Sequence, residues 1–136
     1  MRHAMNQCTA SRVIGGVTLG WLVCFAYLTL SPRVPDLPGL SSHDRVLGGG
    51  HLLASFILTA LVYLWLVTAF PRLPARRTAA LAFGAASAFG LVVELVQVPV
   101  PEREPQLADA VLDVVGSGLA VAALARVSRP ALRRRV

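Results

Sequence analysis

Residues 78–98 read TAALAFGAASAFGLVVELVQV, and this stretch decides the fold class. Its apolar residues are continuous rather than confined to one stripe of a helix, and Glu94 is its single charged residue. A helix that is apolar on every side suits lipid, where all backbone polar groups must be bonded within the segment. The stretch is long enough to cross a hydrocarbon core of about 30 Å, and Pro99 and Pro101 end it. It predicts a transmembrane helix.

Three further apolar blocks have the same character, at residues 13–30, 48–70 and 107–127. The segments between them are rich in proline, serine and arginine, which favour loops. No A-x-A-like cleavage site closes the first block, so we expect it to be retained as a helix rather than removed as a signal peptide. The sequence therefore predicts an all-α integral membrane protein. Residues 1–136 are expected to form one domain of four transmembrane helices, with an Arg-rich tail at 128–136.

The overall composition excludes an ordinary soluble domain. Apolar residues make up 55% of the chain, charged residues 15%, and the mean hydropathy is +0.64. A soluble domain of this length needs more polar side chains to cover its surface. The net charge of +6 comes from short arginine runs beside the apolar blocks, with no aromatic interleaving and no nucleic-acid-binding motif. We expect the partner to be a lipid bilayer and not nucleic acid.

The arginines predict the orientation of the bundle. With four spans, the N-terminus, the second loop and the C-terminal tail share one side, and ten of the 13 basic residues, all arginine, fall there. Arginine accumulates on the cytoplasmic side of membrane proteins, so both termini are expected in the cytoplasm (N-in/C-in). The acids lie in the outer loops or near the outer ends of the spans: Asp36, Asp44, Glu94, Glu102, Glu104, Asp109 and Asp113.

Polar side chains gather near the outer ends of three of the expected helices. Glu94 and Gln97 are three residues apart, and Asp109 and Asp113 are four apart, so each pair shares a helix face. Counted from the cytoplasmic helix ends, Glu94, Asp113 and His51 lie about 20–28 Å along their helices. The sequence therefore places ionisable groups from three helices at a similar depth, which makes them a candidate site.

Ionisable groups at this depth normally face the bundle interior and have partners. Arg103, in the loop between the two acid-bearing helices, is the partner that we expect for Glu94. The alternative is that the acids only end helices at the membrane interface, where Asp109 at a helix N-terminus is favourable anyway. Runs of small residues should let the third and fourth helices approach closely. They are Gly84, Ser87 and Ala88 in the third, and Gly116, Ser117 and Ala120 in the fourth.

The order of these residues resembles the VanZ-like family of membrane proteins. In that family E-x-x-Q is followed by R-x5-D-x3-N-x2-G, and this chain keeps the spacing with Glu94, Gln97, Arg103, Asp109, Asp113 and Gly116. Leu30-Ser31-Pro32 is similar to the family's L-S-P end of the first helix, and Asp44-Arg45 to the D-K that opens the second. The resemblance covers about residues 20–125. Two positions depart from it: Asp113 stands where the family has Asn, and Gly48 where it has His, with His51 as the candidate substitute.

The resemblance implies a multi-pass protein of the bacterial cytoplasmic (inner) membrane that influences resistance to glycopeptide antibiotics, teicoplanin in particular. It implies an outward-facing polar site for a lipid-linked or cell-wall ligand at the outer leaflet of the cell envelope. We expect Glu94 and Arg103 to form the core ion pair, with Gln97, Asp109 and Asp113 orienting the ligand. Asp44, Arg45 and His51 are expected to form a gate. Because its acids outnumber its arginines, the cluster should hold a proton, a cation or a cationic ligand group.

Two other functions stay open. The first is a membrane-embedded transferase or hydrolase acting on an envelope lipid, with Glu94 or Asp113 as general base. The second is a structural membrane protein without catalysis, whose polar groups only fasten helices together. Cys8 and Cys24 lack metal-ligand spacing, and the chain has no phosphate-binding loop and no H-E-x-x-H motif, so no cofactor and no metal site is expected.

Overall fold

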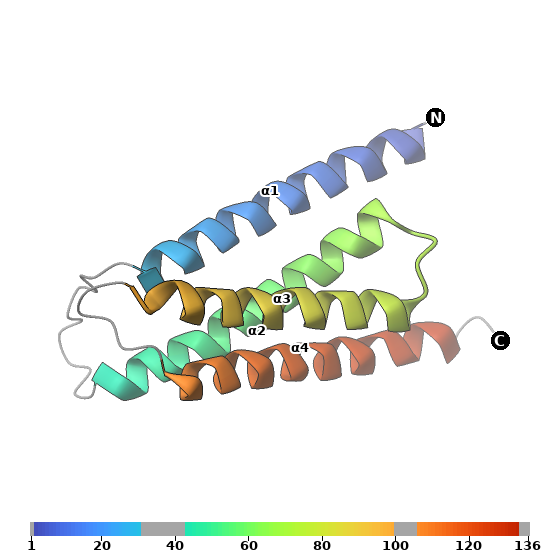
Figure 1. The fold of residues 1–136 in the computed structure, drawn as a ribbon. Helices are drawn as coiled ribbons and strands as arrows, with labels where there is room; N and C mark the ends of the chain where they lie inside the picture. The colour runs from blue at the N-terminus through green and yellow to red at the C-terminus, as the bar shows by residue number, and fades with distance from the viewer. Residues whose placement is uncertain (1, 31–42, 100–105, 134–136) are drawn as a thin grey trace.

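The described part of the chain forms four long α-helices (Figure 1). The structure is a computed structural model that describes residues 2–30, 43–99 and 106–133, and the side chains within 7–30, 49–99 and 106–126. The helices are α1 (Arg2–Leu30), α2 (His43–Ala69), α3 (Ala75–Gln97) and α4 (Leu107–Arg133). Each contains a segment long and apolar enough to cross a membrane: Gln7–Leu30, Gly49–Ala69, Ala75–Gln97 and Leu107–Arg126. The expectation of an all-α chain with four such helices is confirmed.

All four helices extend beyond the apolar blocks that predicted them, α3 only by beginning at Ala75 rather than at residue 78. α1 begins at Arg2 rather than near residue 13, α2 begins at His43 rather than near 48, and α4 ends at Arg133 rather than near 127. Hydropathy marks only the part of a helix that suits lipid, whereas the helical backbone can continue into polar flanking residues. Residues 2–12 contain neither proline nor glycine, so nothing in them ends α1.

The exterior of the bundle is apolar along most of its length. Large side chains such as Leu19, Leu95 and Leu107 are 63%, 63% and 80% exposed. In water such a surface would be strongly unfavourable, whereas hydrocarbon chains solvate it well. The arrangement is that of a multi-pass membrane protein.

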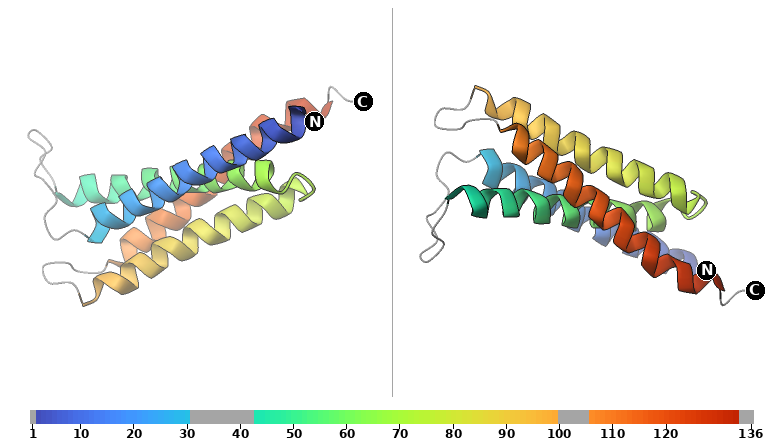
Figure 2. Two further views of the ribbon diagram at one scale, coloured as in Figure 1. Left: turned by 90° about the horizontal axis from the view of Figure 1, so that it is seen from above. Right: turned by 90° about the horizontal axis from the view of Figure 1, so that it is seen from below.

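α2 is the central helix of the bundle and packs against α1, α3 and α4. α1 packs mainly on α2, and within the described residues it makes no contact with α4. The N-terminal half of α1 stands apart from α3 and α4, whereas its C-terminal end approaches them (Figure 1). The C-terminal ends of α1 and α3 and the N-terminal ends of α2 and α4 therefore lie together at one end of the molecule, as both views of Figure 2 show.

The interior contains few large apolar side chains and many small or polar ones. Phe25, Leu58 and Ala86 form its apolar cluster. Several buried hydroxyls bond within their own helices: Thr29 Oγ1 donates to the carbonyl of Phe25, and Thr59 Oγ1 to the carbonyl of Ser55, each at 2.8 Å. Such hydroxyls are satisfied without a second helix. The polar groups that do join helices are concentrated at one end of the bundle.

Candidate functional site

Four ionisable side chains from three helices meet at the end where α2 and α4 begin and α3 ends. His51 lies in the first turn of the apolar span of α2, and Glu94 lies in the last turn of α3. Asp109 and Asp113 lie in the first two turns of α4. All but Asp109 are buried, with His51 6% and Glu94 6% exposed and Asp113 fully enclosed.

His51 is held between the two aspartates of α4. Its Nδ1 lies 3.3 Å from Asp113 Oδ2, and its Nε2 lies 3.7 Å from Asp109 Oδ2. A carboxylate only accepts hydrogen bonds, so Nδ1 is the nitrogen that donates to Asp113. In a neutral imidazole this leaves the lone pair of Nε2 directed toward Asp109.

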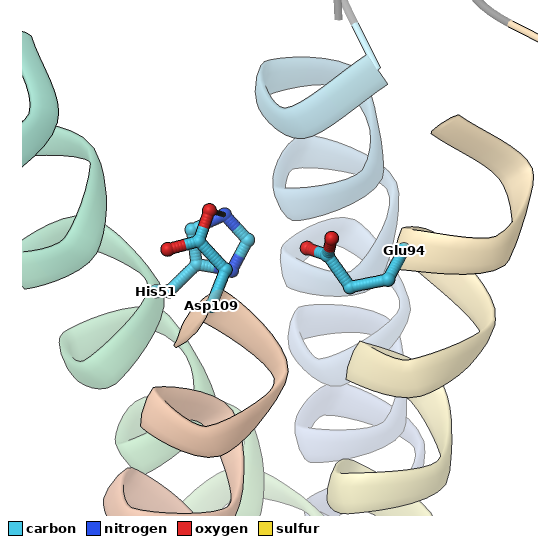
Figure 3. A group of neighbouring side chains, drawn as sticks. All are labelled: His51, Glu94 and Asp109. Atoms are coloured by element: carbon cyan, nitrogen blue, oxygen red, sulfur yellow. Dashed lines mark ion pairs between the residues drawn. The ribbon is translucent and has the colours of Figure 1, made fainter. Parts of the chain in front are cut away.

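Glu94 faces this pair from the opposite side of the site (Figure 3). Its Oε2 accepts a hydrogen bond of 3.0 Å from the backbone N–H of Gln106, immediately before α4. Its Oε1 is buried and has no hydrogen-bond partner among the described residues. One donor atom from each of His51, Glu94 and Asp109 lies within 4.8 Å of the other two.

Two glycines bring the helices close enough to build the site. A Cβ added at Gly90 of α3 would overlap Asp113 Oδ2 and lie 2.8 Å from Asp113 Cβ. A Cβ added at Gly116 of α4 would overlap the carbonyl oxygen of Leu52 in α2. Both glycines are therefore required for close contact, as small residues are in membrane helix packing.

α1 covers the site with aromatic side chains. The ring of Phe25 meets His51 edge-on, with 5.7 Å between ring centroids. Trp21 Nε1 donates a hydrogen bond of 3.1 Å to the carbonyl of Ala54, which ties α1 to α2. An apolar groove of about 170 Å³ lies between α1 and α2, with Phe25 in its lining. It is lined by Trp21, Cys24, Phe25, Leu28, Gly50, Leu53 and Ala54.

The site carries an excess of acids. Glu94, Asp109 and Asp113 face a single imidazole, and the described arginine side chains make no ion pair with them. Asp113 Oδ1, like Glu94 Oε1, is buried without a hydrogen-bond partner in the described part of the chain. Unpaired carboxylates in a poorly solvated interior are unfavourable unless a proton or a cation neutralises them. The arrangement is suited to binding positive charge.

The structure brings together some of the residues singled out in the sequence and separates others. Glu94, Asp109 and Asp113 lie close together, and His51 lies between the two aspartates, while its part in a gate stays a prediction. Gln97 is also buried, and its Nε2 donates a hydrogen bond of 2.8 Å to the carbonyl of Thr29 in α1. Arg103 lies outside the described residues, as do the side chains of Asp44 and Arg45 in the first turn of α2.

Gly90, the α3 glycine on which the site depends, lies outside the predicted packing run. Gly84 and Ala88, expected to form the packing run of α3, are exposed, and a Cβ at Gly84 would meet nothing within 4 Å. The buried run is instead Thr78, Ala82, Ala86, Gly90 and Glu94. Its strict four-residue spacing ending on the buried acid was the signal available in the sequence.

A scan against models of protein families, a search of curated proteins and a search of solved structures each find no match to this chain. Carboxylate oxygens and an imidazole nitrogen, all directed at one space, are acceptors for a positively charged ligand.

Proposed function

We propose that this is a VanZ-like protein of the bacterial cytoplasmic membrane, whose outward-facing polar site binds a positively charged group at the outer leaflet. The observation that carries the proposal is the buried, unpartnered oxygen of Glu94, which faces His51 and Asp109 across the site. A charged side chain in the membrane costs roughly 2.5–3.5 kcal/mol on insertion scales. Three acids at one place therefore favour a bound counter-charge.

The proposed orientation places the site outside. The arginines of the N-terminus, the α2–α3 connection and the C-terminal segment favour the cytoplasm for the opposite end of the bundle. The site then lies about one helical turn below the outer surface. A ligand reaching it from the outer leaflet would place its polar part among the acids.

The apolar groove supports a ligand with a lipid part. Its lining includes Phe25, whose ring also meets His51 edge-on. An acyl or polyprenyl chain fits an apolar groove of this kind, because lipid-facing surfaces solvate hydrocarbon well. The proposed ligand is thus a lipid-linked or cell-wall molecule, and the proposed consequence of binding is altered sensitivity to teicoplanin.

The test is to express the chain in a teicoplanin-susceptible host and to measure the minimal inhibitory concentration. We expect it to rise with the wild-type chain and to return to the host value with Glu94→Gln, which preserves shape and removes charge. Leu95→Ala, at the neighbouring 63% exposed position, is the matched control and should behave as wild type. Immunoblots of membranes verify equal amounts of protein. An unchanged inhibitory concentration with the wild-type chain contradicts the proposed role.

A second candidate function is a membrane transferase or hydrolase acting on an envelope lipid. The same unpartnered oxygen of Glu94 favours it, because a general base needs an oxygen free to accept a proton. Lipid extracts of cells with and without the chain would then differ in one species, and Glu94→Gln would abolish that difference. Identical extracts would exclude it.

A further inference from the structure

The spacing of donor atoms in the site is short for an organic cation. His51 Nε2 and Asp109 Oδ2 are 3.7 Å apart. Two acceptors can each take a hydrogen bond from one ammonium nitrogen, at a donor–acceptor distance of about 2.9 Å. Such acceptors are about 4.7 Å apart. Two ligands at about 2.0–2.1 Å from one metal ion in tetrahedral geometry are about 3.4 Å apart. The observed separation is closer to that of metal ligands.

The hydrogen bond to Asp113 prepares His51 for this role. With its Nδ1 bonded to Asp113 Oδ2, the imidazole presents Nε2 to Asp109. Histidines that bind metals almost always donate their other ring N–H to a carboxylate or carbonyl, which fixes the tautomer and the ring orientation. Asp113 has no exposed surface, so it is suited to this positioning role.

Glu94 supplies the third ligand. Its burial and its unpartnered oxygen also indicate, independently of the donor spacing, that the space takes a ligand. It is 6% exposed, its Oε1 has no hydrogen-bond partner among the described residues, and its carboxylate points at the His51–Asp109 pair (Figure 3). The three donor atoms lie within 4.8 Å of one another. Glu94 would have to move inward by up to about 1.4 Å to reach metal-ligand distance, a movement that a flexible side chain at the end of a helix permits.

We propose that His51 Nε2, Glu94 and Asp109 bind a divalent first-row transition ion of the zinc type, with Asp113 positioning the histidine. One nitrogen and two carboxylate oxygens favour such an ion over Mg²⁺ or Ca²⁺, which prefer oxygen ligands alone. Three protein ligands leave a coordination position open to a further ligand. The proposal rests on the proposed function in one respect, since it identifies the positive charge that the site holds.

The test uses the full chain, purified in detergent micelles with Cys8→Ser and Cys24→Ala to remove the thiols. Co²⁺ is the probe, since its visible absorption reports coordination, and Zn²⁺ is the competitor. We expect saturable Co²⁺ binding that Zn²⁺ displaces. Glu94→Gln and His51→Gln should abolish it, and Asp113→Asn should weaken it about 10–100-fold. His43→Gln, the same substitution on the same helix, is the matched control and should bind as wild type.

Far-ultraviolet circular dichroism of each variant separates loss of binding from loss of fold. Absence of Co²⁺ and Zn²⁺ binding by the wild-type chain overturns the proposal, as does binding that survives both Glu94→Gln and His51→Gln. If the Arg103→Gln variant binds Co²⁺ and the wild-type chain does not, Arg103 neutralises the site and the proposal is also wrong. A wild-type chain that confers teicoplanin resistance without binding metal leaves the proposed function standing. One that binds metal without conferring resistance leaves the metal site standing.

Discussion

Replacing Gly90 by alanine tests the closest approach of α3 to α4. The added Cβ would lie 2.8 Å from both Cβ and Cγ of Asp113 and would overlap Asp113 Oδ2. Carbon atoms pack at about 3.5–4.0 Å, so the two helices must separate by about 1 Å or Asp113 must leave its place. Overpacking of this kind costs about 1–3 kcal/mol. We expect Gly90→Ala to lower the free energy of unfolding by that amount.

The assay is equilibrium unfolding of the purified chain in mixed micelles, followed by circular dichroism as the denaturing detergent fraction rises. Gly84→Ala is the matched control, because it lies on the same helix and its Cβ would meet nothing within 4 Å. It should be neutral or stabilising by up to about 1 kcal/mol, since alanine favours helix more than glycine does. Equal stability losses at the two glycines, or no loss at Gly90, would refute the close approach.

Three further predictions follow from the same structure. Gly116→Ala should lower the free energy of unfolding by about 1–3 kcal/mol in the same assay. Gly118→Ala should not, because the nearest neighbour of its added Cβ lies at 4.0 Å. Equal effects of the two substitutions would contradict the α2–α4 contact. Gln97→Ala should lower the free energy of unfolding by about 1 kcal/mol, because it removes the hydrogen bond to α1. Metal binding should stay intact, and loss of the Co²⁺ absorption would show that Gln97 belongs to the site. In the cysteine-free chain, Pro101→Cys should react with an impermeant thiol reagent from outside intact cells and Ala75→Cys should not; the opposite pattern would invert the proposed orientation.

The fold was predictable because lipid imposes a simple requirement on sequence. Continuous apolar blocks such as residues 78–98 predict a spanning helix whatever its neighbours are, and the structure has a helix there. Helix ends were less predictable, since α1 continues to Arg2 through residues that are polar yet compatible with helix. Depth along each helix also identified Glu94 and Asp113 as acids at one level of the bundle.

The partners within the site were not predictable, because they depend on how the helices cross. Gln97 is three residues from Glu94 and shares its face, yet a small rotation directs it to α1 and leaves Glu94 facing α4. His51 was predicted at the same depth as Glu94 and Asp113, but its place between the two aspartates of α4 follows from the close contact of α2 with α4 at Gly116. Sequence spacing describes neighbours on one helix, whereas His51, Glu94 and Asp109 come from three.

The central claim is that His51, Glu94 and Asp109 form one site that holds a positively charged ion. The most direct test is to purify the chain from membranes without added metal or chelator. Its metal content is then measured by inductively coupled plasma mass spectrometry. We predict close to one zinc-type ion per chain in the wild type and almost none in the Glu94→Gln variant. The same metal content in both, or none in either, would contradict it.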